Sequence, residues 1–339
     1  MTDSSDTVMV TGGSGFLATW IIVALLQRGY KVRSTVRSAA REAQARANIT
    51  RAVDPGDRLS FTFADLLDEA GWSEAAAGAR YVIHPASPMQ VGEYAKTDVI
   101  RPAREGTLRV LEAAKKAGAE HVVVTSSVEA CKLPATSAGV ANEDVWTNLE
   151  GKGVSDYGKS KTLAEQDLWD WAGKAERPTV TTILPGFIQG PVLGEDFSGS
   201  VELVAKLMRG QAPMAPRIGM SMVDVRDVAA LHIRAMTDKA ARGKRFVAAG
   251  DFLWFLEVSE LLRERFRGHA GKLPTKEAPD AMIKAAALMN AEMRQLVPSL
   301  GKRREFDSSR AKRLLDWQAR PAREAVLDGA QSLIDLGLV

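Results

Sequence analysis

Tyr157 and Lys161 are the residues whose types and spacing most directly suggest chemistry. They lie four positions apart in a segment predicted to be helical, so both side chains project from one face of that helix. An ammonium group beside a phenol favours the phenolate and lowers a pKa that is ordinarily about 10. This spacing predicts that Tyr157 exchanges a proton with an alcohol oxygen while Lys161 tunes its pKa. The alternative is two residues on a solvated helix face.

Two serines, Ser126 and Ser127, follow a β-branched run at residues 121–125. Such a run predicts a strand that ends at the serines. A serine hydroxyl at that position can hydrogen-bond a substrate carbonyl and orient it for reaction. The serines therefore strengthen the interpretation of Tyr157 and Lys161 as a reacting pair.

Glycines at positions 12, 13 and 15 separate a short apolar run at residues 8–10 from a helical pattern that continues to Gly29. A strand, a glycine turn and a helix bring bare backbone N–H groups and a helix N-terminus against a pyrophosphate. The spacing up to Ala18 fits a dinucleotide-binding fingerprint. The alternative is a glycine-rich loop of any α/β protein, but the strand before the turn and the helix after it favour a dinucleotide.

Predicted strands alternate with helical segments along most of the chain, which is typical of an α/β fold with a doubly wound parallel sheet. Right-handed crossovers place the carboxyl ends of all the strands at one edge, where ligands bind. We predict a dinucleotide-binding Rossmann domain over residues 1–185, to which residues 221–249 return. Residues 186–220 and 250–339 are predicted to form a smaller, mostly helical substrate-binding region. The predicted strands cover residues 30–37, 59–64, 81–84, 121–125, 179–184 and 245–248. A helix is predicted over residues 38–58 that ends at a turn signal at residues 54–57, and another helix is predicted over 280–296.

The residues after the second predicted strand indicate which dinucleotide binds. An acidic residue there accepts a hydrogen bond from the ribose 2′-hydroxyl, whereas an arginine pairs with a 2′-phosphate. Residues 31–40 contain Arg33 and Arg37 and no acid, which favours NADP over NAD unless both arginines are merely solvated. Asp65, just past the third strand, either holds the adenine amino group or caps the following helix.

Composition excludes several classes of protein. The 339 residues are 45% hydrophobic and 26% charged, as in an ordinary globular protein, and a net charge of +3 gives no reason to expect a nucleic-acid partner. The single cysteine, Cys131, excludes an internal disulfide. The polar start of the chain and the absence of an apolar run of about 18 residues lead us to expect a cytoplasmic protein without a membrane partner. The four histidines have no metal-ligand spacing, so we expect no metal site.

Taken together, these motifs resemble a known family. The glycine turn, Ser126-Ser127 and the Tyr157–Lys161 pair look like those of the extended short-chain dehydrogenase/reductases. The narrower resemblance is to the dihydroflavonol reductases and their microbial aldehyde and ketone (carbonyl) reductase relatives. It is carried by residues 35–37, 84–88, 142–146, 157–165, 185–191, 222–229 and 306–309, so it covers most of the chain.

The resemblance implies reduction of a small-molecule carbonyl compound to an alcohol with NADP(H) as the coenzyme. Ser127 would hold the carbonyl oxygen, with Ser126 as the alternative; Tyr157 would protonate it, and Lys161 would also bind the nicotinamide ribose. Arg37 would bind the 2′-phosphate. The remaining coenzyme contacts implied are Thr11, Gly12, Gly15, Phe16 and Leu17 in the turn, Asp65 and Leu66 at the adenine, and Pro185 and Ile188 at the nicotinamide.

Two other functions stay open on these residues. A nucleotide-sugar epimerase or dehydratase with bound NAD would use the same fold, but such epimerases usually carry an asparagine where this chain has Ala103. A dinucleotide sensor without catalysis would not need both Tyr157 and Lys161. We expect an apolar substrate pocket near Met89, Phe187, Met214 and Met220, and the chain to be a monomer or a homodimer.

Overall fold

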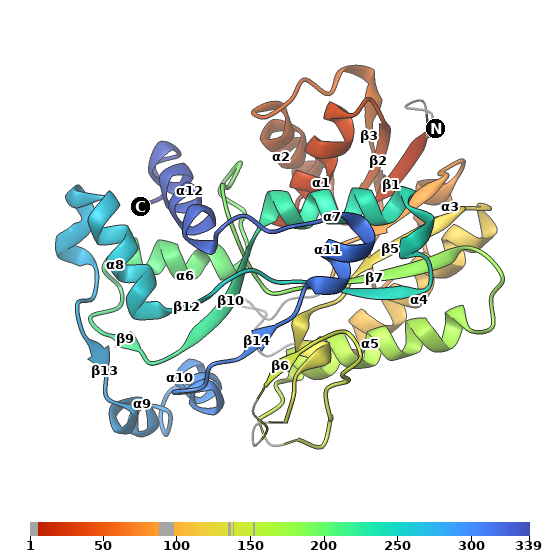
Figure 1. Ribbon diagram of the computed structural model, residues 1–339. Helices are drawn as coiled ribbons and strands as arrows, with labels where there is room; N and C mark the ends of the chain where they lie inside the picture. The colour runs from red at the N-terminus through yellow and green to blue at the C-terminus, as the bar shows by residue number, and fades with distance from the viewer. Residues whose placement is uncertain (1–5, 88–97, 135–136, 138, 152) are drawn as a thin grey trace.

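A computed structural model of the chain describes residues 6–87, 98–134, 137, 139–151 and 153–339. At its centre lies a parallel sheet of seven strands in the order β11-β7-β5-β4-β1-β2-β3 (Figure 1). This topology confirms the predicted α/β fold with a doubly wound sheet. The strands are β1 (Thr7–Val10), β2 (Lys31–Val36), β3 (Leu59–Phe63), β4 (Tyr81–His84), β5 (His121–Thr125), β7 (Thr179–Pro185) and β11 (Lys244–Ala248).

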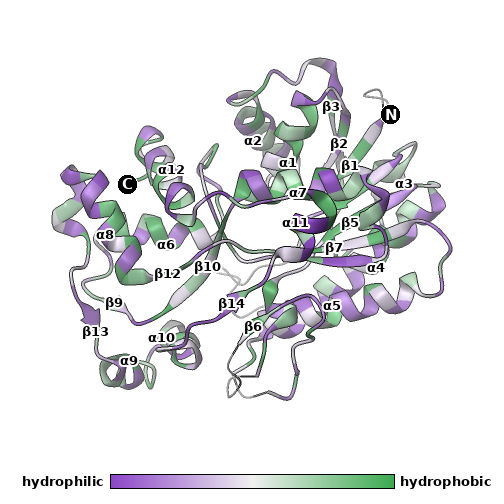
Figure 2. Cartoon of the chain, in the orientation of Figure 1, coloured by the Kyte–Doolittle hydropathy of each residue, from purple (hydrophilic) through white to green (hydrophobic). Residues whose placement is uncertain are grey.

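Helices cover both faces of this sheet. On one face lie α1 (Phe16–Gln27), α2 (Ala39–Thr50) and α7 (Val225–Thr237); on the other lie α3 (Trp72–Ala76), α4 (Ile100–Lys116) and α5 (Asp156–Ala172). In Figure 2 the colours of α5 and α7 alternate between hydrophobic and hydrophilic along the helix, the pattern of a helix with one buried face.

Alternate residues of the central strands pack into the two hydrophobic cores, one on each face of the sheet. Val8 and Val10 pack beneath α1 and α7, whereas Met9 packs into the core with α4 and α5. Ile83 and Val82 divide in the same way on β4. Strands of a parallel sheet are buried on both faces, so their sequences read as continuous apolar runs. For this reason the strand positions could be predicted closely.

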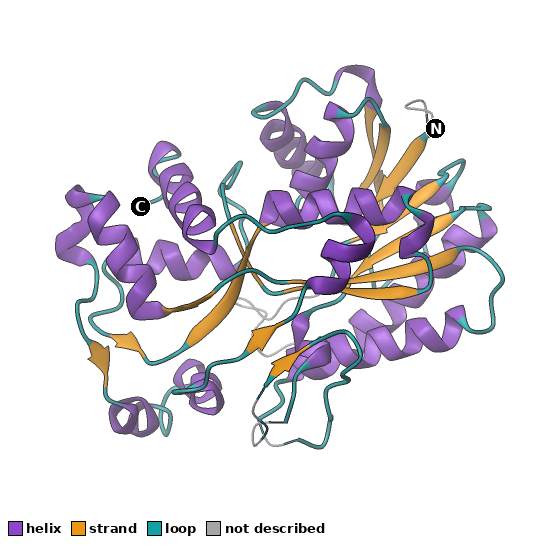
Figure 3. Cartoon of the chain, viewed as in Figure 1, coloured by secondary structure: helices purple, strands orange, loops and turns teal. Residues whose placement is uncertain are grey.

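A smaller region adjoins the sheet, and helices make up most of it, as predicted (Figure 3). Its core lies between a three-stranded sheet and three helices. The sheet consists of β8 (Phe187–Gln189), β10 (Gly219–Asp224) and β12 (Phe252–Trp254), and the helices are α6 (Gly199–Met208), α8 (Phe255–Arg265) and α12 (Ala322–Asp335). The other elements of this region are β9 (Ala215–Pro216), which pairs with β13 (Glu277–Ala278), β14 (Glu305–Phe306), which pairs with β6 (Val140–Ala141), and the helices α9 (Asp280–Ala286), α10 (Ala291–Leu296) and α11 (Ser309–Leu315).

Two predicted helices are wrong in extent. The helix predicted over residues 38–58 ends at Thr50, and a turn follows in which Asp54 Oδ1 accepts a hydrogen bond from the N–H of Gly56. The helix predicted over residues 280–296 is broken into α9 and α10. Asn290 starts the second helix, since its Oδ1 accepts from the N–H of Met293. In both segments an amide or carboxylate side chain competes with the helical hydrogen bonds.

Residues 221–249, predicted to return to the Rossmann domain, contain the end of β10, α7 and β11, and Val223 of β10 packs into the core with α1 and α7. β10 pairs with β8 and β12, whereas α7 and β11 pack on and join the central sheet. Trp317 and α11 also pack into the core beneath α1 and α7. The division into a Rossmann domain and a substrate-binding region stays a prediction. Among the described residues, no helix combines the length and the apolar character that crossing a membrane requires.

Candidate active site

The glycine turn after β1 has no side chains at Gly12, Gly13 and Gly15 that could keep a ligand from its backbone. Gly12 has φ +67°, a conformation that favours glycine, and a Cβ on it would lie 2.9 Å from the Cβ of Ala86. Its N–H donates to Thr35 Oγ1 at 3.0 Å, which ties the turn to β2. Gly15 is the N-cap of α1, which has no side-chain cap and no acidic residue in its first turn. The N-terminus of α1, with Phe16 and Leu17 in its first turn, therefore suits an anion.

Thr11 connects this turn to the end of the neighbouring strand β4. Its hydroxyl hydrogen-bonds His84 Nδ1 at 2.7 Å and accepts from the N–H of Ala86 at 3.2 Å. His84 is buried, and both burial and the charge of Lys161 lower its pKa to about 3. His84 is therefore neutral at physiological pH and positions Thr11 rather than exchanging protons.

Ser127 and Tyr157 come together although they are thirty positions apart in the sequence. Ser127 follows β5 and Tyr157 lies in the first turn of α5, and the Ser127 hydroxyl is close enough to the phenol to lower its pKa. Ser155 caps α5, its side chain accepting from the N–H of Gly158 at 3.0 Å, so the cap fixes where Tyr157 emerges. The serine hydroxyl and the phenol thus face a common point at the carboxyl edge of the sheet.

The neighbouring serine, Ser126, is engaged elsewhere. Its hydroxyl donates to the buried carboxylate of Glu165 at 2.6 Å. The two candidates for the carbonyl-binding serine therefore have different surroundings, and the serine that lies against Tyr157 is Ser127.

Lys161 is buried beside this pair. Its Nζ donates to the carbonyl oxygen of Thr125 at 3.1 Å and lies 6.0 Å from the centre of the Tyr157 ring. Burial lowers its pKa to about 8, against the charge of Glu165, which raises it. A small pocket beside Lys161 is lined by residues of the β4 and β5 ends and of α5, among them His84, Ala86, Thr125, Ser126 and Glu165.

The expected lowering of the Tyr157 pKa by Lys161 is wrong for the chain by itself. Burial dominates and raises the pKa of Tyr157 to about 12, against the opposing effect of the Ser127 hydroxyl. In this state the phenol is protonated throughout the neutral range. A protonated phenol is the form that donates a proton.

Arg33 and Arg37, the two candidates for the 2′-phosphate, lie in different surroundings. Arg33 lies within the strand and its Nη1 donates to carbonyl oxygens at the end of α3, the shortest bond being 2.5 Å to Ala77. Arg37 follows the strand and is exposed. Arg37 is therefore the arginine at the carboxyl edge, whereas Arg33 holds α3 against the sheet.

Asp65 and Leu66 lie past the end of β3. Asp65 Oδ1 accepts from the N–H of Leu67 at 2.9 Å in a local turn. Asp65 does not cap the following helix, because α3 begins at Trp72 and its N-cap is Gly71. Leu66 packs against Gly106 of α4, where a Cβ would lie 2.8 Å from it. Both residues are half-buried.

Pro185 ends β7 and Ile188 lies in β8, at the junction of the two regions. Gly186 between them allows close approach, since a Cβ there would lie 2.4 Å from the carbonyl oxygen of Ser221. Of the residues expected near the substrate, Phe187, Met214 and Met220 are half-buried, and Met89 lies outside the described residues. Within the described part of the chain, no group of histidine, cysteine and carboxylate side chains is placed to hold a metal ion.

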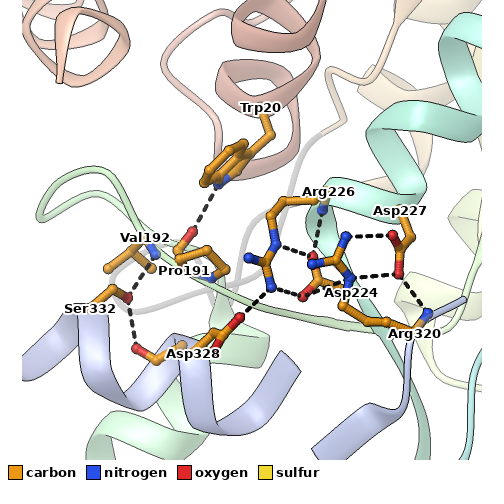
Figure 4. Close-up of polar contacts among 10 residues, drawn as sticks. Trp20, Pro191, Val192, Asp224, Arg226, Asp227, Arg320, Asp328 and Ser332 are labelled. Carbon is orange, nitrogen blue, oxygen red and sulfur yellow. Dashed lines mark hydrogen bonds and ion pairs between the residues drawn. The ribbon is translucent and has the colours of Figure 1, made fainter. Parts of the chain in front are cut away.

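A polar connection links α1 to the C-terminal helix (Figure 4). Trp20 on α1 donates from Nε1 to the carbonyl oxygen of Pro191 at 2.8 Å. The next N–H along, that of Val192, donates to Ser332 Oγ on α12 at 2.9 Å. The segment after β8 is thus held between the two regions.

A cluster of charged residues at the start of α7 continues this connection (Figure 4). The buried Asp224 accepts two bonds from Arg226, and Arg226 also bonds Asp328 on α12 at 2.6 Å. Asp227 accepts from Arg320 through both carboxylate oxygens. None of these bonds involves Ser127 or Tyr157, and the bond between Arg226 and Asp328 ties α7 to α12.

Sequence analysis missed Glu165 and Arg245. They form a buried ion pair, with Nε of Arg245 2.8 Å from Oε1 of Glu165, directly behind Ser126. One signal was available for Glu165, which lies four residues after Lys161 and hence on the same helix face. No such signal in the sequence pointed to Arg245, because a charged residue near the start of a strand usually lies at the surface.

Comparison with known proteins places these observations in a family. Residues 8–249 match the model of the family described as "NAD dependent epimerase/dehydratase family". The chain is 32% identical over 279 residues to tetraketide alpha-pyrone reductase 1 of Arabidopsis thaliana, covering 78% of this chain and 83% of that one. It is 31% identical to cinnamoyl-CoA reductase 1 of Oryza sativa subsp. japonica, covering 85% of this chain and 84% of the other.

Solved structures of similar shape include two Gre2 proteins crystallised with NADPH. Yeast methylglyoxal/isovaleraldehyde reductase Gre2 has a TM-score of 0.78 and 25% identity, covering 98% of this chain and 100% of that chain. Gre2 from Candida albicans has a TM-score of 0.79 and 23% identity, covering 98% and 99%. The second likeness supports the fold alone.

Proposed function

Since this chain belongs to the NAD dependent epimerase/dehydratase family, the extended short-chain dehydrogenase/reductases, we propose that it reduces ketones or aldehydes to alcohols with NADPH. The observation that carries the proposal is the proximity of the Ser127 hydroxyl to the phenol of Tyr157, close enough to lower its pKa, with Lys161 one helical turn further on. All three lie at the edge of the sheet where the glycine turn also ends. A small-molecule carbonyl placed there would meet a hydrogen-bond donor and an acid together.

The residues at this edge fit a dinucleotide. A Cβ at residue 12 would crowd the glycine turn, whereas glycine leaves its backbone open to a ligand, and the uncapped N-terminus of α1 suits a pyrophosphate. Arg37 is exposed at the position that suits a 2′-phosphate, and both Gre2 structures were crystallised with NADPH. When bound, the reduced nicotinamide supplies the hydride. We assign the coenzyme contacts to Thr11, Gly12, Gly15, Phe16, Leu17, Arg37, Asp65, Leu66, Pro185 and Ile188.

The chain's own groups handle the oxygen of the substrate. Ser127 donates a hydrogen bond to the carbonyl oxygen, which orients it and stabilises the charge that develops there. Tyr157 then gives its proton to that oxygen, a role for which a pKa of about 12 keeps it protonated. The ammonium group of Lys161 stabilises the phenolate that remains and is placed to bind a ribose hydroxyl.

The second candidate is a nucleotide-sugar epimerase or dehydratase, which the name of the matching family favours. The curated relatives named above are reductases, and Ala103, buried on α4, has no amide to offer a sugar substrate. The two functions differ in their use of coenzyme, because an epimerase regenerates it in every turnover whereas a reductase consumes it.

The direct test is a panel of aryl and aliphatic ketones and aldehydes offered with NADPH and, separately, with NADH. We expect NADPH to be oxidised in step with formation of the alcohol, detected by absorbance and chromatography. Copurified NAD together with no net oxidation of NADPH would contradict the proposal and favour the epimerase.

The pH dependence of kcat/KM for NADPH is expected to follow the protonation of Lys161. Burial lowers the pKa of this lysine to about 8, so the ammonium form is present below that pH and is lost above it. The value of kcat/KM for NADPH reports the free enzyme and should decline as pH rises through about 8, while Tyr157, near 12, stays protonated. Lys161→Met should lower kcat/KM and abolish this decline. A wild-type profile that is flat to pH 10 would contradict the assignment.

A further inference from the structure

We propose that the buried pair of Glu165 and Arg245 is a positioning device that holds Ser127 and Lys161 in place against Tyr157. This inference rests on the proposed reductase function and assigns a role to two residues outside the reacting group.

The carboxylate of Glu165 has a full set of hydrogen bonds. Its side chain is 1% exposed, and that of Arg245 is 8% exposed. Oε1 accepts from Thr182 Oγ1 at 2.6 Å and from Arg245 Nε at 2.8 Å. Oε2 accepts from Ser126 Oγ at 2.6 Å and from Arg245 Nη2 at 3.2 Å. Burying two charges is costly, and such a pair is weak evidence for stability, so its place behind the site calls for a functional reason.

Arg245 extends this contact to the loops beyond β5. Its Nη1 donates to the carbonyl oxygens of Glu143 at 2.6 Å and Val145 at 2.9 Å, and its Nη2 donates to that of Ala130 at 3.4 Å. The ring of Trp146 lies over its guanidinium group, 3.7 Å from ring centre to Cζ. A single side chain on β11 thereby gathers backbone from residues 128–131 and 142–147.

Ser127 is consequently held on both sides. The residue before it, Ser126, is tied by its side chain to Glu165, and the short helix after it, η3 (Val128–Cys131), is tied at Ala130 to Arg245. Ser127 Oγ also accepts from the N–H of Glu129 at 3.2 Å. Because catalysis depends on the placement of reacting groups to within a fraction of an ångström, a shift of this segment would misplace the serine hydroxyl.

Lys161 shares the same support. It lies one turn before Glu165 on α5, and its Nζ donates to the carbonyl oxygen of Thr125, the residue before Ser126. The carboxylate favours the ammonium form of Lys161 against the effect of burial. Loss of the Glu165 charge would therefore affect both the carbonyl-binding serine and the lysine.

The test uses Ser126→Ala, which removes the 2.6 Å bond to Glu165 without leaving a charge unpaired, and Glu165→Gln, which removes the charge. In Ser126→Ala we expect kcat for carbonyl reduction to fall on the order of tenfold, the value of one hydrogen bond to a charged group, while the Kd of NADPH stays within about twofold. Ser126→Thr keeps the hydroxyl and should restore kcat. In Glu165→Gln the decline of kcat/KM for NADPH should move to lower pH, because Lys161 loses the charge that favours its ammonium form.

Asp224→Asn is the matched control. It alters a carboxylate that is equally buried and bonded to arginine but lies away from the serine loop, so it should lower the thermal midpoint while kcat stays within about twofold. Ser126→Ala with the kcat of wild type would overturn the inference, as would a loss equal to that of Ser127→Ala, since Ser126 would then hold the carbonyl itself. If Glu165→Gln does not fold, the pair of Ser126 variants decides. Wild-type protein that does not oxidise NADPH with any carbonyl would instead contradict the proposed function.

Discussion

Replacing Tyr157 with phenylalanine is expected to lower kcat for carbonyl reduction by about 10² to 10⁴-fold, the usual contribution of a positioned proton donor. The change removes a single oxygen and with it the proton donor that Ser127 contacts. The ring is kept, so the packing around α5 and the coenzyme site should be unaffected. Stopped-flow or steady-state rates with a reactive aldehyde, together with the Kd of NADPH from fluorescence titration, check both parts of the expectation.

Tyr81→Phe is the matched control for this experiment. Tyr81 is a buried tyrosine at the start of β4, at the opposite end of the strand from His84 and the site. The Tyr81→Phe variant should have the same kcat as wild type. A Tyr157→Phe protein that turns over as fast as wild type would remove the acid role from Tyr157, whereas equal losses in the two variants would indicate a general effect on the fold.

Replacing Arg37 with alanine is expected to weaken the binding of NADPH far more than the binding of NADH. A guanidinium group bonded to a phosphate contributes about 1.5–3 kcal/mol, so the Kd of NADPH should rise by roughly 10- to 150-fold. NADH has no 2′-phosphate, and its Kd should change by less than about twofold. Isothermal titration with each coenzyme gives the ratio directly.

Arg33→Ala, within the strand that precedes Arg37, is the matched control. The Arg33 side chain donates to carbonyl oxygens at the end of α3, so its loss should lower the thermal midpoint and leave the coenzyme ratio unchanged. A change in that ratio in Arg33→Ala and none in Arg37→Ala would move the 2′-phosphate site to Arg33. Equal weakening of both coenzymes in Arg37→Ala would contradict recognition of the phosphate.

The fold of the central sheet was predictable because its signals are local. An apolar run such as that of β5, followed by Ser126, marks the end of a strand regardless of what packs on it. A local signal also marks the start of α5, which carries Tyr157 and Lys161, since Ser155 caps it. Prediction was wrong at residues 51–53, where the helix ends before the predicted turn, and at residues 287–290, where a turn divides the predicted helix.

The smaller region was predicted less completely for a physical reason. Strands of two or three residues, such as β12 and β14, have no periodicity to detect and exist because distant segments pair with them. Only the folded chain brings Glu305 to Val140 or Gly219 to Trp254. Such pairings depend on tertiary contacts that no short stretch of sequence records.

By itself, the sequence determined the residue types that the proposed chemistry needs. It placed Tyr157 and Lys161 on one helix face and glycines where a phosphate must approach closely. Both placements follow from the sequence because helix periodicity and the absence of a Cβ act within a few residues. Only the tertiary structure decided which serine lies against Tyr157, which arginine stands free at the sheet edge, and that Glu165 and Arg245 support the site from behind. It also decided the pKa of Tyr157, since burial of the phenol raises this pKa more than Ser127 lowers it. Burial and long-range hydrogen bonds arise from the packing of segments that are far apart in the chain, and so they belong to the fold rather than to any motif.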